Sequence, residues 1–77
     1  MTLDNAARGE KRRIISVGGT GIARTRLLEL GFVPGTEVKV GRRSPFGDPV
    51  EVMLRGYRLT LRRSELRLIE VSKFPLG

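Results

Sequence analysis

The fold of this chain is decided by residues 26–35, which have the sequence RLLELGFVPG. Apolar residues within 22–30 recur at the spacing of a helix that buries one side. Gly31 follows where the end of a helix favours a left-handed residue, and Phe32 can fold back on Leu27 as in a Schellman motif. We therefore predict one short helix that ends just before Gly31.

The pattern before this helix predicts a strand and then a break. Residues 11–17 are suited to a strand, and Ile15 and Val17 are expected to face inward by its two-residue period. Residues 18–21 contain three glycines that end the strand, and Thr20 is expected to cap the helix. The helix is expected to direct three apolar side chains toward the core: Ala23, Leu27 and Leu30.

A tight turn and a second strand are predicted after the helix. Residues 33–36 have the composition of a type II turn, because proline and glycine occupy its two central positions. The strand over residues 37–42 alternates Val38 and Val40 with charged residues, so the two valines are expected inside. It ends at a loop rich in proline and glycine, residues 44–49.

The remaining strands form a hairpin and a short C-terminal pairing. Residues 50–54 and 57–61 alternate apolar and polar side chains on either side of Arg55-Gly56, which predicts a hairpin with a tight turn. A single 3₁₀ turn over residues 64–66 is expected before a last strand over residues 67–71. The inward set is expected to include Val50, Val52, Leu54, Tyr57, Leu59, Leu61, Ile69 and Val71.

Five short strands with one apolar face are expected to curl into a barrel, because a flat sheet of this size would leave its edges unpaired. The predicted fold is mainly β, a small five-stranded barrel with one short α-helix after the first strand. The 77 residues leave room for a single domain. Within it, residues 1–9 are predicted to be a weakly ordered lead-in and residues 72–77 a tail.

The composition argues against catalysis and metal binding. The chain has neither cysteine nor histidine, so it lacks thiolate nucleophiles, the commonest metal ligand and the usual proton carrier near neutral pH. Gly18, Gly19 and Gly21 match neither a phosphate loop nor a dinucleotide fingerprint. We therefore expect no enzyme, no cofactor and no catalytic or metal-binding residues.

Charge and hydropathy indicate a cytoplasmic protein with an anionic partner. No segment has the pattern of a signal peptide or a membrane span. Fifteen basic residues oppose eight acidic ones, a formal net charge of +7. This charge favours nucleic acid, the anionic lipids of the inner leaflet or an acidic protein surface. Self-association is a further alternative.

Nucleic-acid binding is the competing interpretation of this charge. Arg58, Arg62 and Arg67 are expected to share the outer face of the sheet and to form a basic stripe. Barrels that bind single strands also carry aromatic side chains on which bases stack, and this chain has few. An ordinary solvated basic surface is therefore favoured over a nucleic-acid site.

The 44–49 loop contains the one aromatic residue whose role the pattern leaves open. Phe46 stands between Pro45 and Gly47, so it is either a lid over the barrel or an exposed anchor for a partner. We favour the lid, because small domains have thin cores that loop aromatics help to cover. Asp48 is expected to cap the turn.

Three groups of residues resemble the ferrous iron transport protein A family. They are Arg24-x-Arg26-Leu27-x-Glu29-Leu30-Gly31-Phe32-x-Pro34-Gly35-x-x-Val38-x-Val40, then Pro45-x-Gly47-Asp48-Pro49-x-Glu51, and last Gly56-x-x-Leu59-x-Leu61-Arg62-x-x-Glu65 with Ile69-x-Val71. The resemblance implies an SH3-like barrel. It also implies a small cytoplasmic accessory of the membrane-embedded ferrous iron transporter, whose soluble portion is a GTPase. It does not imply that the chain itself binds iron.

We therefore predict that the barrel docks on the cytoplasmic portion of that transporter, peripheral to the inner face of the membrane. The partner-binding residues are expected on the polar side of the helix and in the loop: Arg24, Arg26, Glu29, Ser44, Pro45, Phe46, Gly47 and Asp48.

Overall fold

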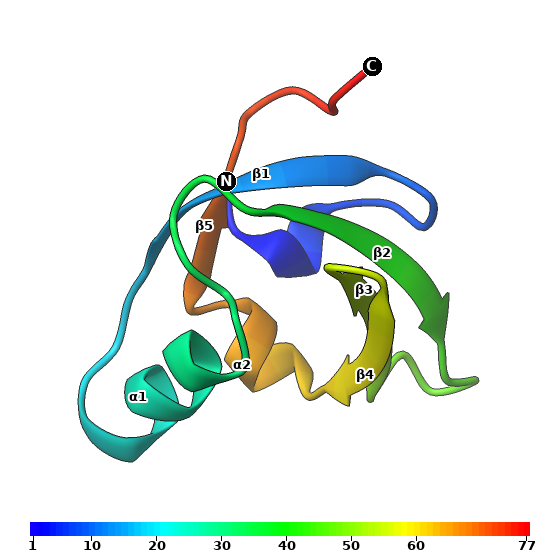
Figure 1. Cartoon of the computed structure of the whole chain (residues 1–77). Helices are drawn as coiled ribbons and strands as arrows, with labels where there is room; N and C mark the ends of the chain where they lie inside the picture. Colours follow the sequence, from blue (N-terminus) through cyan, green and yellow to red (C-terminus); the bar gives the residue numbers. More distant parts are fainter.

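The computed structural model describes residues 1–77 and shows a curled sheet with two helices packed beside it (Figure 1). Its five strands form one antiparallel sheet in the order β4-β3-β2-β1-β5. The elements in chain order are η1 (Leu3–Asn5), β1 (Lys11–Val17), α1 (Gly21–Glu29), β2 (Glu37–Arg43), β3 (Val50–Leu54), β4 (Tyr57–Leu61), α2 (Arg63–Leu66) and β5 (Ile69–Val71). The mainly β class and the helix after the first strand are confirmed.

The predicted Schellman motif at the end of α1 is present. Gly31 has a φ of 109° and donates its N–H to Leu28 O at 3.1 Å. The N–H of Phe32 bonds Leu27 O at 3.0 Å, and both side chains are fully buried. The helix therefore ends where its carbonyl groups find partners and its one deeply buried side chain meets Phe32.

The start of α1 and its inner face differ from expectation. The helix begins at Gly21, and Thr20 makes no side-chain capping hydrogen bond. Ala23 is exposed and Leu30 is only half-buried, which leaves Leu27 as the single buried residue of the helix. The prediction for Ala23 was wrong because only Leu27, in the last turn of α1, is buried in the core.

Both predicted tight turns are confirmed by backbone geometry. Thr36 N–H donates to Val33 O at 3.2 Å, and Gly35 between them has a φ of 92°, as a type II turn requires. The β3–β4 turn has positive φ at Arg55 (49°) and Gly56 (83°), the signature of a type I′ hairpin.

One residue of β1 that was predicted to face inward lies on the outside. Ile15 is 54% exposed, whereas Ile14 is buried. The register against β5 shifts between Ile14 and Ser16, because a bulge places an extra residue on β1. Alternation is interrupted there, and Val17 returns to the core as expected.

The hairpin matches its predicted alternation except at one end. Tyr57 is 43% exposed and lies over α1, where its hydroxyl donates to Leu30 O. The core otherwise consists of aliphatic residues and one phenylalanine: Leu3, Ala6, Ile14, Val17, Leu27, Phe32, Val38, Val40, Val50, Val52, Leu54, Leu61, Leu66, Ile69 and Val71.

The last strand is shorter than predicted. A four-residue helical turn, α2, replaces the expected 3₁₀ turn, and Arg67 closes it by donating its N–H to Arg63 O at 3.0 Å. Because Arg67 belongs to the end of this turn, β5 begins only at Ile69.

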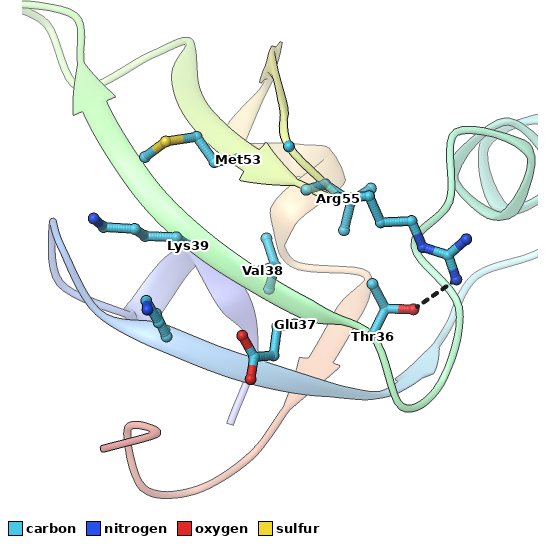
Figure 2. Close-up of a pocket in the computed structure, with 9 residues that line it drawn as sticks. Thr36, Glu37, Val38, Lys39, Met53 and Arg55 are labelled. Atoms are coloured by element: carbon cyan, nitrogen blue, oxygen red, sulfur yellow. Dashed lines mark hydrogen bonds between the residues drawn. The ribbon is translucent and has the colours of Figure 1, made fainter.

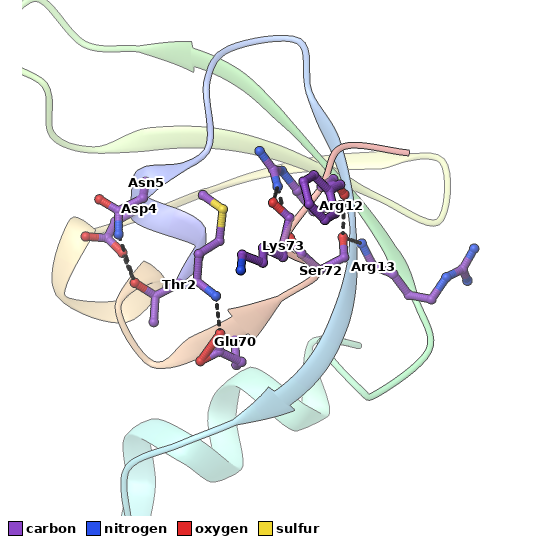
Figure 3. Close-up of polar contacts among 10 residues, drawn as sticks. Thr2, Asp4, Asn5, Arg12, Arg13, Glu70, Ser72 and Lys73 are labelled. Carbon is purple, nitrogen blue, oxygen red and sulfur yellow. Dashed lines mark hydrogen bonds and ion pairs between the residues drawn. The ribbon is translucent and has the colours of Figure 1, made fainter. Parts of the chain in front are cut away.

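The chain ends are held against β1 and β5 (Figure 3). The isolated bridge Thr2–Glu70 places the lead-in beside β5, and Leu3 and Ala6 are buried in the core. Arg12 is only 5% exposed, and its guanidinium donates to Ser72 O at 2.9 Å and to Lys73 O at 2.8 Å. The N–H of Leu76 bonds Lys11 O at 2.8 Å, which extends the tail along the strand.

Candidate partner-binding surface

The two halves of the predicted partner site lie on either side of α2. Figure 1 shows α1 at one side of this short helix and the β2–β3 loop at the other. Contacts join all three elements: Arg26 of α1 pairs with Glu65 of α2, and Asp48 of the loop accepts the Arg63 N–H at 2.8 Å. We call this the α1–α2–loop surface, composed of Ile22, Arg26, Glu29, residues 44–48 and residues 62–65.

The candidate residues of α1 do not all face the same way. Arg24 donates from Nε to Val17 O at 3.1 Å, so its side chain is held against the end of β1. Arg26 and Glu29 border a shallow groove of about 320 Å³ together with Thr25 and Ile22. Ile22 is 88% exposed. Arg24 therefore combines a contact to the end of β1 with an exposed side chain, whereas Arg26 and Glu29 border the groove.

The loop is stiffened by its own hydrogen bonds. Ser44 Oγ donates to Asp48 O at 2.5 Å and accepts the Asp48 N–H at 2.9 Å, while Gly47 N–H bonds Ser44 O at 2.8 Å. The carboxylate of Asp48 caps the start of α2, not only its own turn. The peptide bond that follows, Asp48–Pro49, is cis.

Phe46 is not a lid. Its side chain is 95% exposed, the highest value among the large apolar residues. The loop turns back through the Ser44–Asp48 bonds before Phe46 can reach the barrel, and Phe32 already fills the core. The alternative interpretation, an exposed aromatic side chain at a loop tip, is the one that the structure shows.

Glu65 joins the parts of this surface, and the sequence reasoning placed it in the family pattern but not in the partner site. One carboxylate oxygen accepts the Arg62 N–H at 3.0 Å and the other pairs with Arg26. Its side chain is 18% exposed, so it lies between the two helices. The spacing of three residues between Arg62 and Glu65 is the available signal, because an acidic residue there can bond the N-cap backbone.

The arginines of the nucleic-acid alternative do not form one stripe. Arg58 lies on β4, whereas Arg62 and Arg67 flank α2 at its two ends. Arg67 Nε also pairs with Asp4 Oδ2 at 3.6 Å. The prediction that the three share the outer sheet face was wrong because the chain leaves the sheet after Leu61.

Ionisable groups are spread over the molecule. Hydrogen bonds from the Arg12 guanidinium and from the Ala7 N–H lower the pKa of Glu10, which lies at the start of β1, away from α2. No three side chains of histidine, cysteine, aspartate or glutamate gather into a cluster suited to a metal ion. None of the helices combines the length and apolar character needed to span a bilayer.

The curled five-stranded antiparallel sheet, with a helix after its first strand, defines a small SH3-like barrel. The model of the FeoA domain matches residues 1–73. The chain belongs to the FeoA family, as its sequence pattern predicted.

Relatives support both the family and the fold. A Porphyromonas gingivalis (strain ATCC BAA-308 / W83) protein, an Fe(2+) transport protein A/Fe(2+) transporter FeoB fusion, is 38% identical over 72 residues. The match takes in 94% of this chain but only 8% of that protein. The FeoA protein of Chlorobium tepidum is 41% identical with a TM-score of 0.84, covering 92% of this chain and 68% of its own.

The FeoA of Stenotrophomonas maltophilia, a structure complexed with zinc, is described as an SH3 domain protein. It is 33% identical with a TM-score of 0.83, and the match covers 94% of this chain and 89% of that one. The expected SH3-like fold is thereby confirmed.

Proposed function

We propose that this chain is a small cytoplasmic accessory of ferrous iron uptake that docks on the cytoplasmic GTPase portion of the membrane ferrous iron transporter. The support is the P. gingivalis relative, in which a segment similar to this chain is part of one polypeptide with the transporter FeoB. Two proteins that are fused in one organism commonly bind each other in organisms where they are separate chains. The docking site is the α1–α2–loop surface.

The observation that carries this placement is the pair of exposed apolar side chains on that surface. Ile22 is 88% exposed and Phe46 is 95% exposed, and they stand on the two elements that α2 joins. Buried aromatic anchors dominate the energy of many protein interfaces. Phe46 on a loop held by its own hydrogen bonds loses little conformational freedom on binding, which favours its use as such an anchor.

Charge on the same surface supports specificity. Arg26 and Glu65 form an ion pair at its centre, while Arg62 and Arg63 are exposed and their guanidinium groups form no ion pair. Arginines at the edge of an interface accelerate encounter with an acidic partner and fix its orientation. The partner surface is therefore expected to be acidic around an apolar pocket.

A binding experiment with matched phenylalanine variants tests the proposal. Detergent-solubilised full transporter is immobilised, and binding of the wild-type chain is compared with Phe46→Ala and Phe74→Ala. Phe74 is the control, because it is 73% exposed and lies on the tail. We expect Phe46→Ala to weaken binding about 10- to 30-fold, as truncation of an anchor does, and Phe74→Ala to leave it unchanged.

Ile22→Ala gives a second variant on the other element and favours helix formation, so it should not unfold α1. Equal binding by Phe46→Ala, Ile22→Ala and the wild type would show that this surface is not the docking site. Absence of binding by the wild-type chain would contradict the proposed function itself.

A further inference from the structure

One row of side chains crosses four strands on the outer face of the sheet. Lys11 lies opposite Lys39, Lys39 opposite Met53, and Met53 opposite Arg58. Residues directly opposite in neighbouring strands share a face, and strands lie about 4.8 Å apart, so the row is about 14 Å long. Figure 2 shows Lys39 and Met53 side by side on this face. Three of its four members are cationic.

This row works against folding stability. Like charges directly opposite each other in an antiparallel pair are destabilising, and Lys11 faces Lys39 without an acidic residue between them. Neither lysine nor Arg58 has a carboxylate within 4 Å, since the five ion pairs of the protein lie elsewhere. An arrangement that costs stability and has no internal partner indicates an external one.

The row is the shared wall of two shallow grooves. One has a volume of about 290 Å³ and includes Lys11 and Arg55, and the other, of about 270 Å³, includes Arg8, Arg42 and Arg58. Lys39 and Met53 line both grooves. We call this the basic outer face, and its basic members are Arg8, Lys11, Lys39, Arg42, Arg55 and Arg58.

Acidic groups do little to neutralise the basic outer face. Its grooves contain only two carboxylates, Glu37 and Glu51. Glu37 is paired with Arg13 at 3.7 Å. Glu51 lies over Gly41, where an added Cβ would be 2.7 Å from Oε1. The basic side chains of the face outnumber its two carboxylates, so the face has a net positive charge.

The absence of aromatic side chains from the basic outer face indicates which class of molecule binds there. It has no aromatic side chain in either groove, which disfavours the base stacking of single-stranded nucleic acid and the anchors of a specific protein interface. A second copy of the same positive face would repel it. Several long, flexible cations around one methionine suit a surface that requires charge and little shape complementarity.

We propose that the basic outer face binds the anionic headgroups of a phospholipid bilayer. Each lysine or arginine close to such a membrane contributes about 1 kcal/mol, or about fivefold in affinity, so clusters of four to eight bind appreciably. The face uses β1–β4, whereas the docking surface uses α1, α2 and the β2–β3 loop. The inference therefore does not rest on the proposed function.

Vesicle sedimentation with the full chain tests this inference. The vesicles contain equal parts of phosphatidylglycerol and phosphatidylcholine, and pure phosphatidylcholine vesicles are the neutral comparison. We expect binding to the anionic vesicles only, and loss of binding when the salt is raised from about 0.05 M to about 0.5 M, because screening shortens the range of the attraction. Equal binding to neutral vesicles would overturn the inference.

Lys39→Glu is the informative variant, because it replaces a like-charge pair opposite Lys11 by an attractive one and so should not destabilise the fold. We expect each charge reversal to weaken vesicle binding roughly 30-fold, and Lys39→Glu/Arg58→Glu to abolish it. The matched control is Arg62→Glu/Arg63→Glu, which changes the net charge equally on the other surface and should retain most binding.

An equal loss in the control double variant would mean that net charge alone acts, and the basic outer face would not be the site. Tighter binding to a short single-stranded oligonucleotide or to a poly-glutamate peptide than to the vesicles would assign the face to nucleic acid or to an acidic protein instead. Either result would overturn the lipid assignment.

Discussion

Replacing Gly31 by alanine should destabilise the protein by an amount that the structure allows us to work out. Gly31 has a φ of 109°, a conformation that costs other residues about 1–3 kcal/mol. A Cβ there would lie 3.2 Å from Cδ2 of Leu54, which is buried, and such overpacking adds about 1 kcal/mol. The lower entropy of the unfolded alanine chain offsets about 0.5–1 kcal/mol. The net expected loss is about 1–3.5 kcal/mol.

The assay is urea and thermal unfolding followed by circular dichroism. For a domain of this size the expected loss lowers the Tm by about 5–25 °C. Two other glycines separate the causes. Gly35 also has positive φ (92°) but no atom within 4 Å of its added Cβ, so Gly35→Ala should lack the contact cost. Gly18→Ala meets only Leu68 O at 3.5 Å, an ordinary contact, and should be nearly neutral.

The comparison can refute each part of the reasoning separately. If the free energy of unfolding of Gly31→Ala is within about 0.5 kcal/mol of the wild-type value, the left-handed conformation does not determine stability at this helix end. If Gly35→Ala costs as much as Gly31→Ala, the contact with Leu54 contributes nothing. A loss at Gly18→Ala would show that any added methyl group is harmful in this small protein.

Two further predictions concern the core and the effect of pH. Leu27→Ala removes the one buried residue of α1 and should cost about 2–5 kcal/mol, with faster amide exchange in α1 than in β3 as the check. The pKa of Glu10 in the folded protein lies below its ordinary value of about 4.5. The carboxylate therefore stabilises the fold fully at pH values above about 4.5, and this contribution is lost as the pH falls through the folded pKa. Glu10→Gln should make the free energy of unfolding depend less on pH in acid, as measured by urea unfolding at successive pH values. An unchanged pH profile would contradict this assignment.

Local signals allowed most of the fold to be predicted. The Schellman end at Gly31 and the tight hairpin turn at Arg55-Gly56 depend on residues close together in the chain, and both predictions were confirmed. Ile15 was misplaced because a bulge depends on how β1 pairs with β5, which no local pattern records. The buried Arg12 was missed for a related reason, since its partners are carbonyl groups of the tail.

The candidate site was only partly predictable. The α1 residues and the loop were chosen separately, and nothing in the sequence shows that α2 joins them. Arg26 and Glu65 are far apart in the chain, so their pairing follows only from the fold. Phe46 was misassigned because composition shows that a core is thin but not whether a loop can reach it.

The pairing of β1 with both β2 and β5 affects how the protein folds during synthesis. This strand, near the start of the chain, pairs with β2 on one side and with the last strand, β5, on the other. During synthesis, Ile14 and Leu3 stay exposed to solvent until residues 69–71 have left the ribosome and β5 can pack against them. Folding is therefore expected to follow translation as one late cooperative step, and not to proceed from the N-terminus as the chain emerges.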